Sequence, residues 1–140
     1  PTSIMSPIYR GFKPDTSDHK CVFSGVKLPK TDETSTVGVD AAHIMPWAKT
    51  GINSIQNGLC LSKTCHWAFD EGILRLKFDT GKYSVYIPPR MPAASKRANF
   101  DIQYFHSFTG TIPVARLPAN SADWPSLRYI NQLNNYLDSR

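Results

Sequence analysis

The sequence predicts an α+β fold in which two short strands precede a helix, a hairpin and a C-terminal helix. Residues 37–44 are mostly β-branched or small, which favours a strand, and Pro46 ends it because proline cannot donate a ladder hydrogen bond. Residues 57–61 alternate with leucines on one face, as a returning strand does. Helical spacing predicts a terminal helix beginning near Ser121. Its apolar stripe comprises Leu127, Ile130, Leu133 or Asn134, and Leu137.

The helix after the second strand is predicted from its ends. The hydroxyls of Ser62 and Thr64 can cap its first free amides, and Gly72 fits its last turn. His66 and Asp70 are spaced i, i+4 on this helix, so they share one face. A carboxylate and an imidazole placed in this way can both reach one cation.

The remaining segments are more irregular. Residues 73–78 and 82–87 alternate around an Asp-Thr-Gly turn, which predicts a hairpin. Residues 21–26 are a short apolar run that indicates a strand and a turn. Residues 88–120 are rich in proline and lack a period, so we expect an extended wrap with short elements. Residues 1–20 are polar and proline-rich and indicate an arm or linker.

Composition limits the class of protein. A chain of 140 residues that is 41% hydrophobic can form one domain with a hydrophobic core. We expect this domain over residues 21–140, with its central unit at 21–78 and a C-terminal extension at 88–140. The net charge of +5 suits a polyanion such as nucleic acid, although many domains are this basic. No apolar run approaches the ~20 residues that span a bilayer. The odd number of cysteines, 3, and the lack of a signal-like leader predict a cytoplasmic protein.

Three polar residues stand in an order that suits phosphodiester hydrolysis. Such a reaction needs a base for water and positive charge at the phosphate. His43 can serve as the base because a histidine titrates near physiological pH. Taken singly, His43 favours an ordinary half-buried strand histidine, Asn57 fits an Asn-Gly turn that would also shape the site, and Asp70 fits a helix-end carboxylate as well as a metal ligand. The order His43, Asn57, His66 favours the reactive interpretation.

These segments resemble a known family. Residues 40–47 (DAAHIMPW), 57–59 (NGL) and 66–70 (HWAFD) are similar to the motifs of the HNH nucleases, whose fold is a ββα-metal (His-Me finger) core. The resemblance covers about residues 21–78 and implies a metal-dependent DNA endonuclease. It implies His43 as general base, Asn57 as the residue that orients it, and a single divalent metal. The implied metal ligands are His66, Asp40 and Asp70.

The chain departs from the family pattern at Ala42, where many members carry a metal-binding Asp or His. Asp40 lies two positions earlier, about 6.6 Å along an extended strand, so a bulge or a water would have to close the gap. The Asp-Ala-Ala-His-Ile wording is typical of a subgroup linked with bacterial restriction. Ala42 also favours an alternative, an HNH-fold DNA-binding module that has lost cleavage.

The cysteines depart from the family pattern as well. Members brace the fold with zinc held by two C-x-x-C pairs, of which this chain keeps only Cys21 and Cys65, with Cys60 out of position. Two thiolates cannot close a tetrahedral site, so no structural zinc is expected. Apolar packing is expected in its place, by Phe23, Leu59, Leu61 and Phe69. A third alternative, a structural metal domain for protein contacts, would require tight zinc binding by His66 and the cysteines.

The resemblance also implies cofactor and partners. Mg²⁺ or Mn²⁺ is the expected ion, and an imidazole ligand also admits Ni²⁺, Co²⁺ or Zn²⁺. DNA backbone contacts are expected from Lys49, Lys63, Arg75 and Lys77. Trp47, Trp67 and Phe69 are expected in the core rather than on a base-stacking surface. The expected role is restriction or phage defence, with target recognition by a separate domain, fused or recruited; a homodimer is compatible with the sequence.

Overall fold

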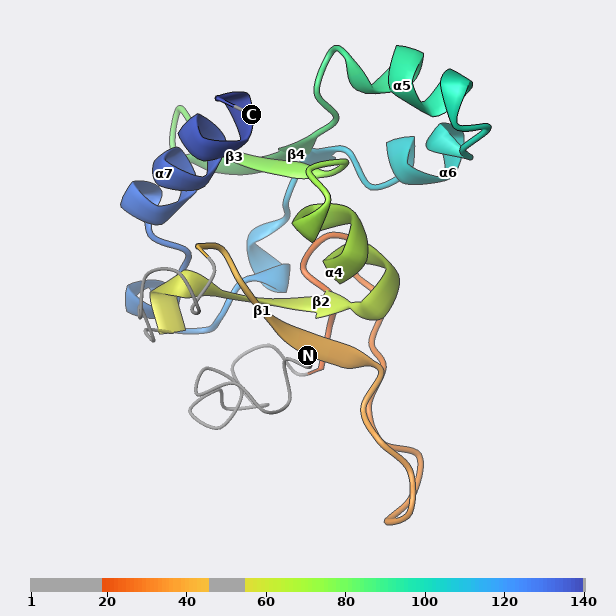
Figure 1. Ribbon diagram of the computed structural model, residues 1–140. Helices are drawn as coiled ribbons and strands as arrows, with labels where there is room; N and C mark the ends of the chain where they lie inside the picture. Colours follow the sequence, from red (N-terminus) through yellow and green to blue (C-terminus); the bar gives the residue numbers. More distant parts are fainter. Residues whose placement is uncertain (1–18, 46–54, 140) are drawn as a thin grey trace.

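The computed structural model describes residues 19–45 and 55–139, so most of the expected arm at residues 1–20 lies outside the described part. The mixed α/β arrangement is that expected for a ββα core with an added hairpin and terminal helix (Figure 1). Its strands are β1 (Val39–His43), β2 (Gly58–Ser62), β3 (Arg75–Asp79), β4 (Lys82–Tyr86) and β5 (Gly110–Thr111). Its α-helices are α4 (Lys63–Asp70), α5 (Met91–Arg97), α6 (Ile102–His106) and α7 (Leu127–Asp138). Short 3-10 turns are η2 (Ile55–Asn57), η3 (Val114–Arg116) and η4 (Ser121–Asp123).

The first unit is an antiparallel pair of strands followed directly by a helix. β1 pairs with β2 in a register that places His43 opposite Gly58 and Val39 opposite Ser62. The returning strand β2 begins at Gly58, one residue later than predicted, because Asn57 belongs to η2. The predicted helix cap is confirmed, since the Ser62 hydroxyl accepts a hydrogen bond from the backbone N–H of Cys65 at 3.2 Å. This ββα unit carries the candidate site.

The predicted hairpin is confirmed as β3 and β4, joined by Thr80 and Gly81. Both turn residues have positive φ, +48° and +79°, as a tight two-residue hairpin turn requires. β5 adds a third strand beside β4. The stretch at residues 88–120 forms short elements, in keeping with its proline content.

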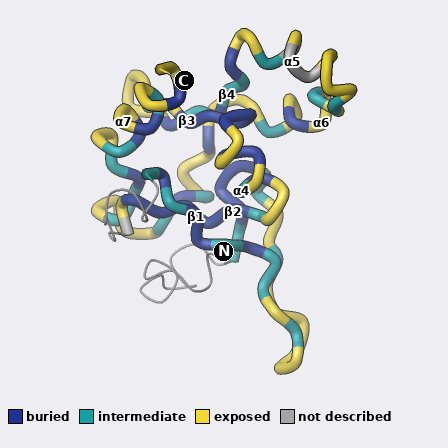
Figure 2. Tube along the Cα trace, in the orientation of Figure 1, coloured by how far each residue is buried: buried dark blue, intermediate teal, exposed yellow. Residues whose placement is uncertain are grey.

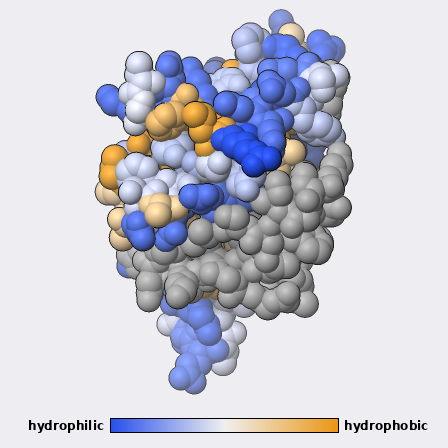
Figure 3. All heavy atoms as spheres, turned by 90° about the vertical axis from the view of Figure 1, so that its left-hand side faces the viewer, coloured by the Kyte–Doolittle hydropathy of each residue, from blue (hydrophilic) through white to orange (hydrophobic). Residues whose placement is uncertain are grey.

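The terminal helix α7 packs on β3, with Ile130, Leu133 and Leu137 buried. Two details of its prediction are wrong. The helix begins at Leu127 and not near Ser121, because a residue before proline disfavours the helical region and Trp124 precedes Pro125 with ψ 156°. Leu127 is 46% exposed, because it is the first residue of the helix. Viewed from the α7 side, the surface is mainly hydrophilic with a small apolar area (Figure 3).

The core runs between the ββα unit and the hairpin, where Figure 2 shows the buried residues. The predicted strand at residues 21–26 is wrong: the segment is a turn in which Cys21 N–H donates to the Val26 carbonyl at 2.9 Å. Gly25 makes this turn with φ +76°. The expected apolar brace is confirmed by the burial of Phe23, Leu59, Leu61 and Phe69, together with the three cysteines.

Two tryptophan predictions have different outcomes. Trp47 lies outside the described residues. The core prediction for Trp67 is wrong, since this residue is 48% exposed and only one side of its ring packs, against Phe100 and Phe105. Within the described ranges, no helix has both the length and the apolarity to cross a membrane.

Candidate active site

His66 on α4 lies between two carboxylates. Its Nδ1 is 2.9 Å from Asp40 Oδ2, and its Nε2 is 3.2 Å from Asp70 Oδ2. Asp70 reaches His66 across one helical turn, as the i, i+4 spacing predicts. Asp40 reaches His66 from β1 in a direct contact. Strand β1 and helix α4 therefore bring together three of the predicted residues, Asp40, His66 and Asp70.

These contacts determine the protonation of the pair. Burial disfavours the charged imidazole of His66, but hydrogen bonds and charges from Asp70 and Asp40 outweigh it and raise its pKa. Burial also opposes ionisation of Asp40, yet the hydrogen bonds from Lys63 and His66 outweigh it and lower the pKa of this carboxyl. In the metal-free protein His66 therefore favours the imidazolium form between two carboxylates.

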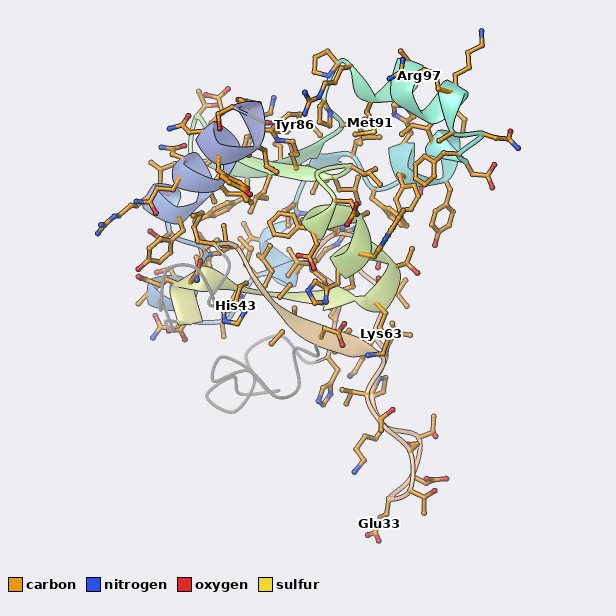
Figure 4. The ribbon with its side chains drawn as sticks, in the orientation of Figure 1. Glu33, His43, Lys63, Tyr86, Met91 and Arg97 are labelled. Carbon is orange, nitrogen blue, oxygen red and sulfur yellow. The ribbon has the colours of Figure 1, made fainter. Side chains whose placement is uncertain are left out.

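His43 is in a different environment at the end of β1 (Figure 4). Its Nε2 is buried and has no hydrogen-bond partner among the residues that the structure describes. Burial lowers its pKa, the charge of His66 lowers it further, and Asp70 acts in the opposite direction. His43 is therefore neutral at physiological pH, the form that can accept a proton. The charges of His66 and Asp70 therefore both act on the His43 ring.

Asn57 fixes the backbone that follows His43. It is fully buried; its Oδ1 accepts from Met45 N–H at 2.8 Å and its Nδ2 donates to the Met45 carbonyl at 3.0 Å. The Asn57 carbonyl also accepts from Ile44 N–H at 2.9 Å. These bonds hold the backbone of the two residues that follow His43.

Among the expected DNA contacts, Lys63 and Lys77 are exposed and Lys49 lies outside the described residues. Lys63 Nζ is 2.7 Å from Asp40 Oδ1, a pair that the sequence analysis did not anticipate. Lys77 Nζ lies over the Tyr86 ring, 5.4 Å from its centre.

The expected DNA contact by Arg75 is wrong. Arg75 is buried, with Nη1 2.7 Å from Asp138 Oδ1 and further bonds to the Oδ1 and carbonyl of Asn134. A guanidinium used in this way cannot reach a phosphate. A sequence signal existed: Asn134 interrupts the apolar stripe of the terminal helix, and Asp138 follows it at i+4. Polar residues on a buried helix face need a polar partner.

The residues can be tested for their fit to a divalent metal. Within the described part of the chain, no group of three or more His, Cys, Asp or Glu side chains forms a ready cage. His66 does pair with a carboxylate oxygen on each ring nitrogen, so two ligands of one ion are at hand. Oxygen and imidazole donors suit Mg²⁺ or Mn²⁺ and also later transition metals. The residues fit an ion that takes two protein ligands and leaves other positions for water and phosphate.

Comparison with known proteins agrees with this geometry. A family model described as HNH endonuclease matches residues 21–76. The segment that carries the candidate site is therefore similar to HNH endonucleases, which are phosphodiester hydrolases that generally use one divalent metal ion.

The fold is also similar to a solved structure titled "Modification dependent TagI restriction endonuclease", with a TM-score of 0.56 and 20% sequence identity. The alignment covers 88% of this chain and 35% of that one, so this chain spans about a third of the solved protein. No curated protein matches the chain.

Proposed function

We propose that the protein is a DNA endonuclease that uses His43 as general base and one divalent ion at His66. The observation that carries this proposal is His43 itself. Its Nε2 is buried without a partner in the described residues, and burial beside His66 keeps the ring neutral. A polar nitrogen left in this state is costly for stability alone but suits a group that takes a proton from water.

In the proposed reaction, His43 Nε2 accepts the proton of the attacking water while Asn57 holds the backbone beside it. The water oxygen forms a bond to phosphorus as the bond between phosphorus and the 3′ oxygen breaks, and the leaving 3′ oxygen takes a proton from solvent water, so that a 5′ phosphate and a 3′ hydroxyl remain. His66 holds the ion, with Asp40 and Asp70 as the available carboxylates. When bound, Mg²⁺ or Mn²⁺ supplies positive charge to the scissile phosphate and the leaving oxygen. His66 must lose its extra proton before a ring nitrogen can act as a ligand.

The proposed setting is restriction or phage defence in the cytoplasm. The fold similarity to a modification-dependent restriction endonuclease supports this setting. The net charge of +5 supports a DNA partner. The exposed side chains of Lys63 and Lys77 are candidates for contacts with the DNA backbone. A separate domain, fused or recruited, would select the target.

Cleavage of supercoiled plasmid in Mg²⁺ or Mn²⁺ tests the proposal. The unaltered protein should nick or linearise the plasmid, and His43→Ala should lower the rate by about 10²- to 10⁴-fold, the usual contribution of a general base. His66→Ala should abolish metal-dependent cleavage. Lys30→Met, at an exposed lysine in the loop before β1, is the matched control, with full folding and near-normal activity. Equal activity of the His43→Ala variant would contradict the assigned base.

Ala42 supports a second candidate, a DNA-binding module without cleavage, because this position lacks the side chain that many HNH members use for metal. In that case the protein retards DNA in gels and leaves the plasmid intact in each metal. A structural metal domain would instead hold stoichiometric zinc after purification.

A further inference from the structure

We propose that Asp40 and Lys63 form a positioning pair behind His66, so that the ion binds on the opposite side, between His66 Nε2 and Asp70. This inference rests on the proposed function and assigns different tasks to its two carboxylates. Asp40 then orients the ligand, and Asp70 is a ligand. Lys63 holds Asp40 and is not primarily a DNA contact.

The contacts of Asp40 account for both of its oxygens. Oδ1 is 2.7 Å from Lys63 Nζ and Oδ2 is 2.9 Å from His66 Nδ1. Lys63 is the first residue of α4, and its side chain reaches back to β1. The labelled Lys63 lies beside the start of this helix in Figure 4. The pair thus joins strand and helix and fixes the carboxylate in one orientation.

Exposure separates the two sides of the imidazole. The side chain of Asp40 is only 12% exposed, whereas that of Asp70 is 56% exposed. A catalytic ion must also accept water and a phosphate oxygen, so it needs the open side. The open side is that of Nε2 and Asp70.

General metal chemistry favours the same assignment. A metal-bound histidine almost always donates its other ring N–H to a carboxylate, carbonyl or water, which fixes the tautomer and the ring orientation. Asp40 lies where it can accept such a bond from Nδ1–H of His66. Lys63 compensates the charge of this partly enclosed carboxylate.

The location of His43 gives further support. His66 and Asp70 both affect the pKa of His43, and Asp40 is not among the groups that do. The charges of His66 and Asp70 therefore act on His43, which is compatible with an ion held by these two residues.

Substitutions at Asp40 and Asp70 separate a ligand from an orienting group. Isothermal titration with Mn²⁺ should give Asp40→Asn nearly normal affinity, because an amide oxygen still accepts from Nδ1–H. Asp40→Ala should bind Mn²⁺ about 10- to 100-fold more weakly, the usual effect of losing such a partner. Asp70→Asn should weaken binding at least as much as Asp40→Ala. The inference is overturned if Asp40→Asn loses affinity like Asp40→Ala while Asp70→Asn retains it.

Nitrogen-15 NMR of the Zn²⁺-loaded protein gives an independent readout. His66 should show a metal-bound Nε2 and a protonated Nδ1, in the unaltered protein and in Asp40→Asn. A metal-bound Nδ1 would overturn the assignment. Circular dichroism verifies that each variant is folded.

The task of Lys63 is tested by DNA binding and kinetics. Lys63→Met should lower kcat with little change in KM, and should leave the salt dependence of DNA affinity unchanged. A phosphate contact would instead reduce the slope of log affinity against log salt by about 1. Lys30→Met, at an exposed lysine with no assigned role, is the matched control and should leave kcat and the salt slope unchanged. A reduced slope with unchanged kcat overturns the positioning role.

Failure of the proposed function has a different signature. If the unaltered protein binds no Mn²⁺, or if His66→Ala leaves binding unchanged, the metal site itself is wrong and this inference falls with it. If the unaltered protein binds Mn²⁺ and His66→Ala does not, the metal site stands. The contrast between the Asp40 and Asp70 variants then tests this inference alone.

Discussion

Arg75 Nη1 donates to Asp138 Oδ1 at 2.7 Å, which ties the start of β3 to the last turn of α7. The same guanidinium donates three hydrogen bonds to Asn134, and the Asn134 amide donates to the Leu76 carbonyl at 2.9 Å. A basic residue that looked suited to DNA is therefore a structural link between the hairpin and the terminal helix.

Replacing Arg75 with Ala should lower the free energy of unfolding by about 2–4 kcal/mol, because it removes a buried guanidinium and leaves partly buried acceptors of Asn134 without their partner. Urea denaturation of the metal-free protein measures this loss. Asp138→Asn should have a smaller effect because Asp138 is exposed. Lys77→Met, on the same strand, is the control and should be near neutral. DNA affinity per folded molecule should be unchanged in the Arg75 variant, and a selective loss of DNA affinity would contradict the structural role.

Asn57 should matter for both stability and catalysis. Asn57→Ala leaves the N–H and carbonyl of Met45 without these side-chain bonds, at a cost of about 1–3 kcal/mol. The backbone after His43 then loses its fixed position, so kcat should fall more than KM changes. Asn57→Asp keeps an acceptor for Met45 N–H but loses the donor, and should be intermediate. Plasmid cleavage at a temperature where all variants are folded measures the effect. Normal kcat in Asn57→Ala would contradict the orienting role.

The ββα unit could be predicted from sequence because its determinants are local. The Ser62 cap and the Thr-Gly hairpin turn each act over a few residues, and both are found in the structure. The i, i+4 spacing likewise places Asp70 against His66 without knowledge of the rest of the fold. The candidate site was therefore largely accessible before the structure.

Other features depend on contacts between distant segments. The burial of Arg75 is set by α7, which lies about 60 positions further along the chain. The half-exposed state of Trp67 depends on how far Phe100 and Phe105 cover it. The Lys63–Asp40 pair depends on the register of β1 with β2, which brings Asp40 beside the start of α4. Residue patterns do not contain this information.

The apolar brace gives a prediction about metal removal. Phe23 and Phe69 meet edge to face at 5.7 Å in the place where a zinc site was considered. Phe69→Ala should therefore cost about 3–5 kcal/mol through the cavity that it leaves. Exhaustive treatment with a chelator should leave the Tm of the unaltered protein unchanged. A large fall in Tm on chelation, with zinc released in stoichiometric amount, would contradict the apolar brace.

The raised pKa of His66 predicts how stability depends on pH in the absence of metal. In the unfolded chain the imidazole has its ordinary pKa of about 6.5. Because the folded protein binds the proton more tightly, the stabilisation is fully present below about pH 6.5 and is lost as the pH rises through the higher folded value. The expected window for this loss therefore begins near pH 6.5 and extends upward.

A pair of variants isolates this effect from the second imidazole of the site. His43→Gln and the double variant His43→Gln/His66→Gln are compared by thermal unfolding in chelator between about pH 5 and 9, a range that contains the ordinary histidine pKa. The His43→Gln variant, which keeps His66, should have a higher Tm than the double variant. This difference in Tm should be largest at the acidic end and should shrink as the pH rises. A difference that stays constant, or that grows with pH, would show that the two carboxylates do not stabilise the imidazolium. Saturating Mn²⁺ should reverse the trend, because a ligand nitrogen must be free of its proton and metal affinity therefore increases with pH.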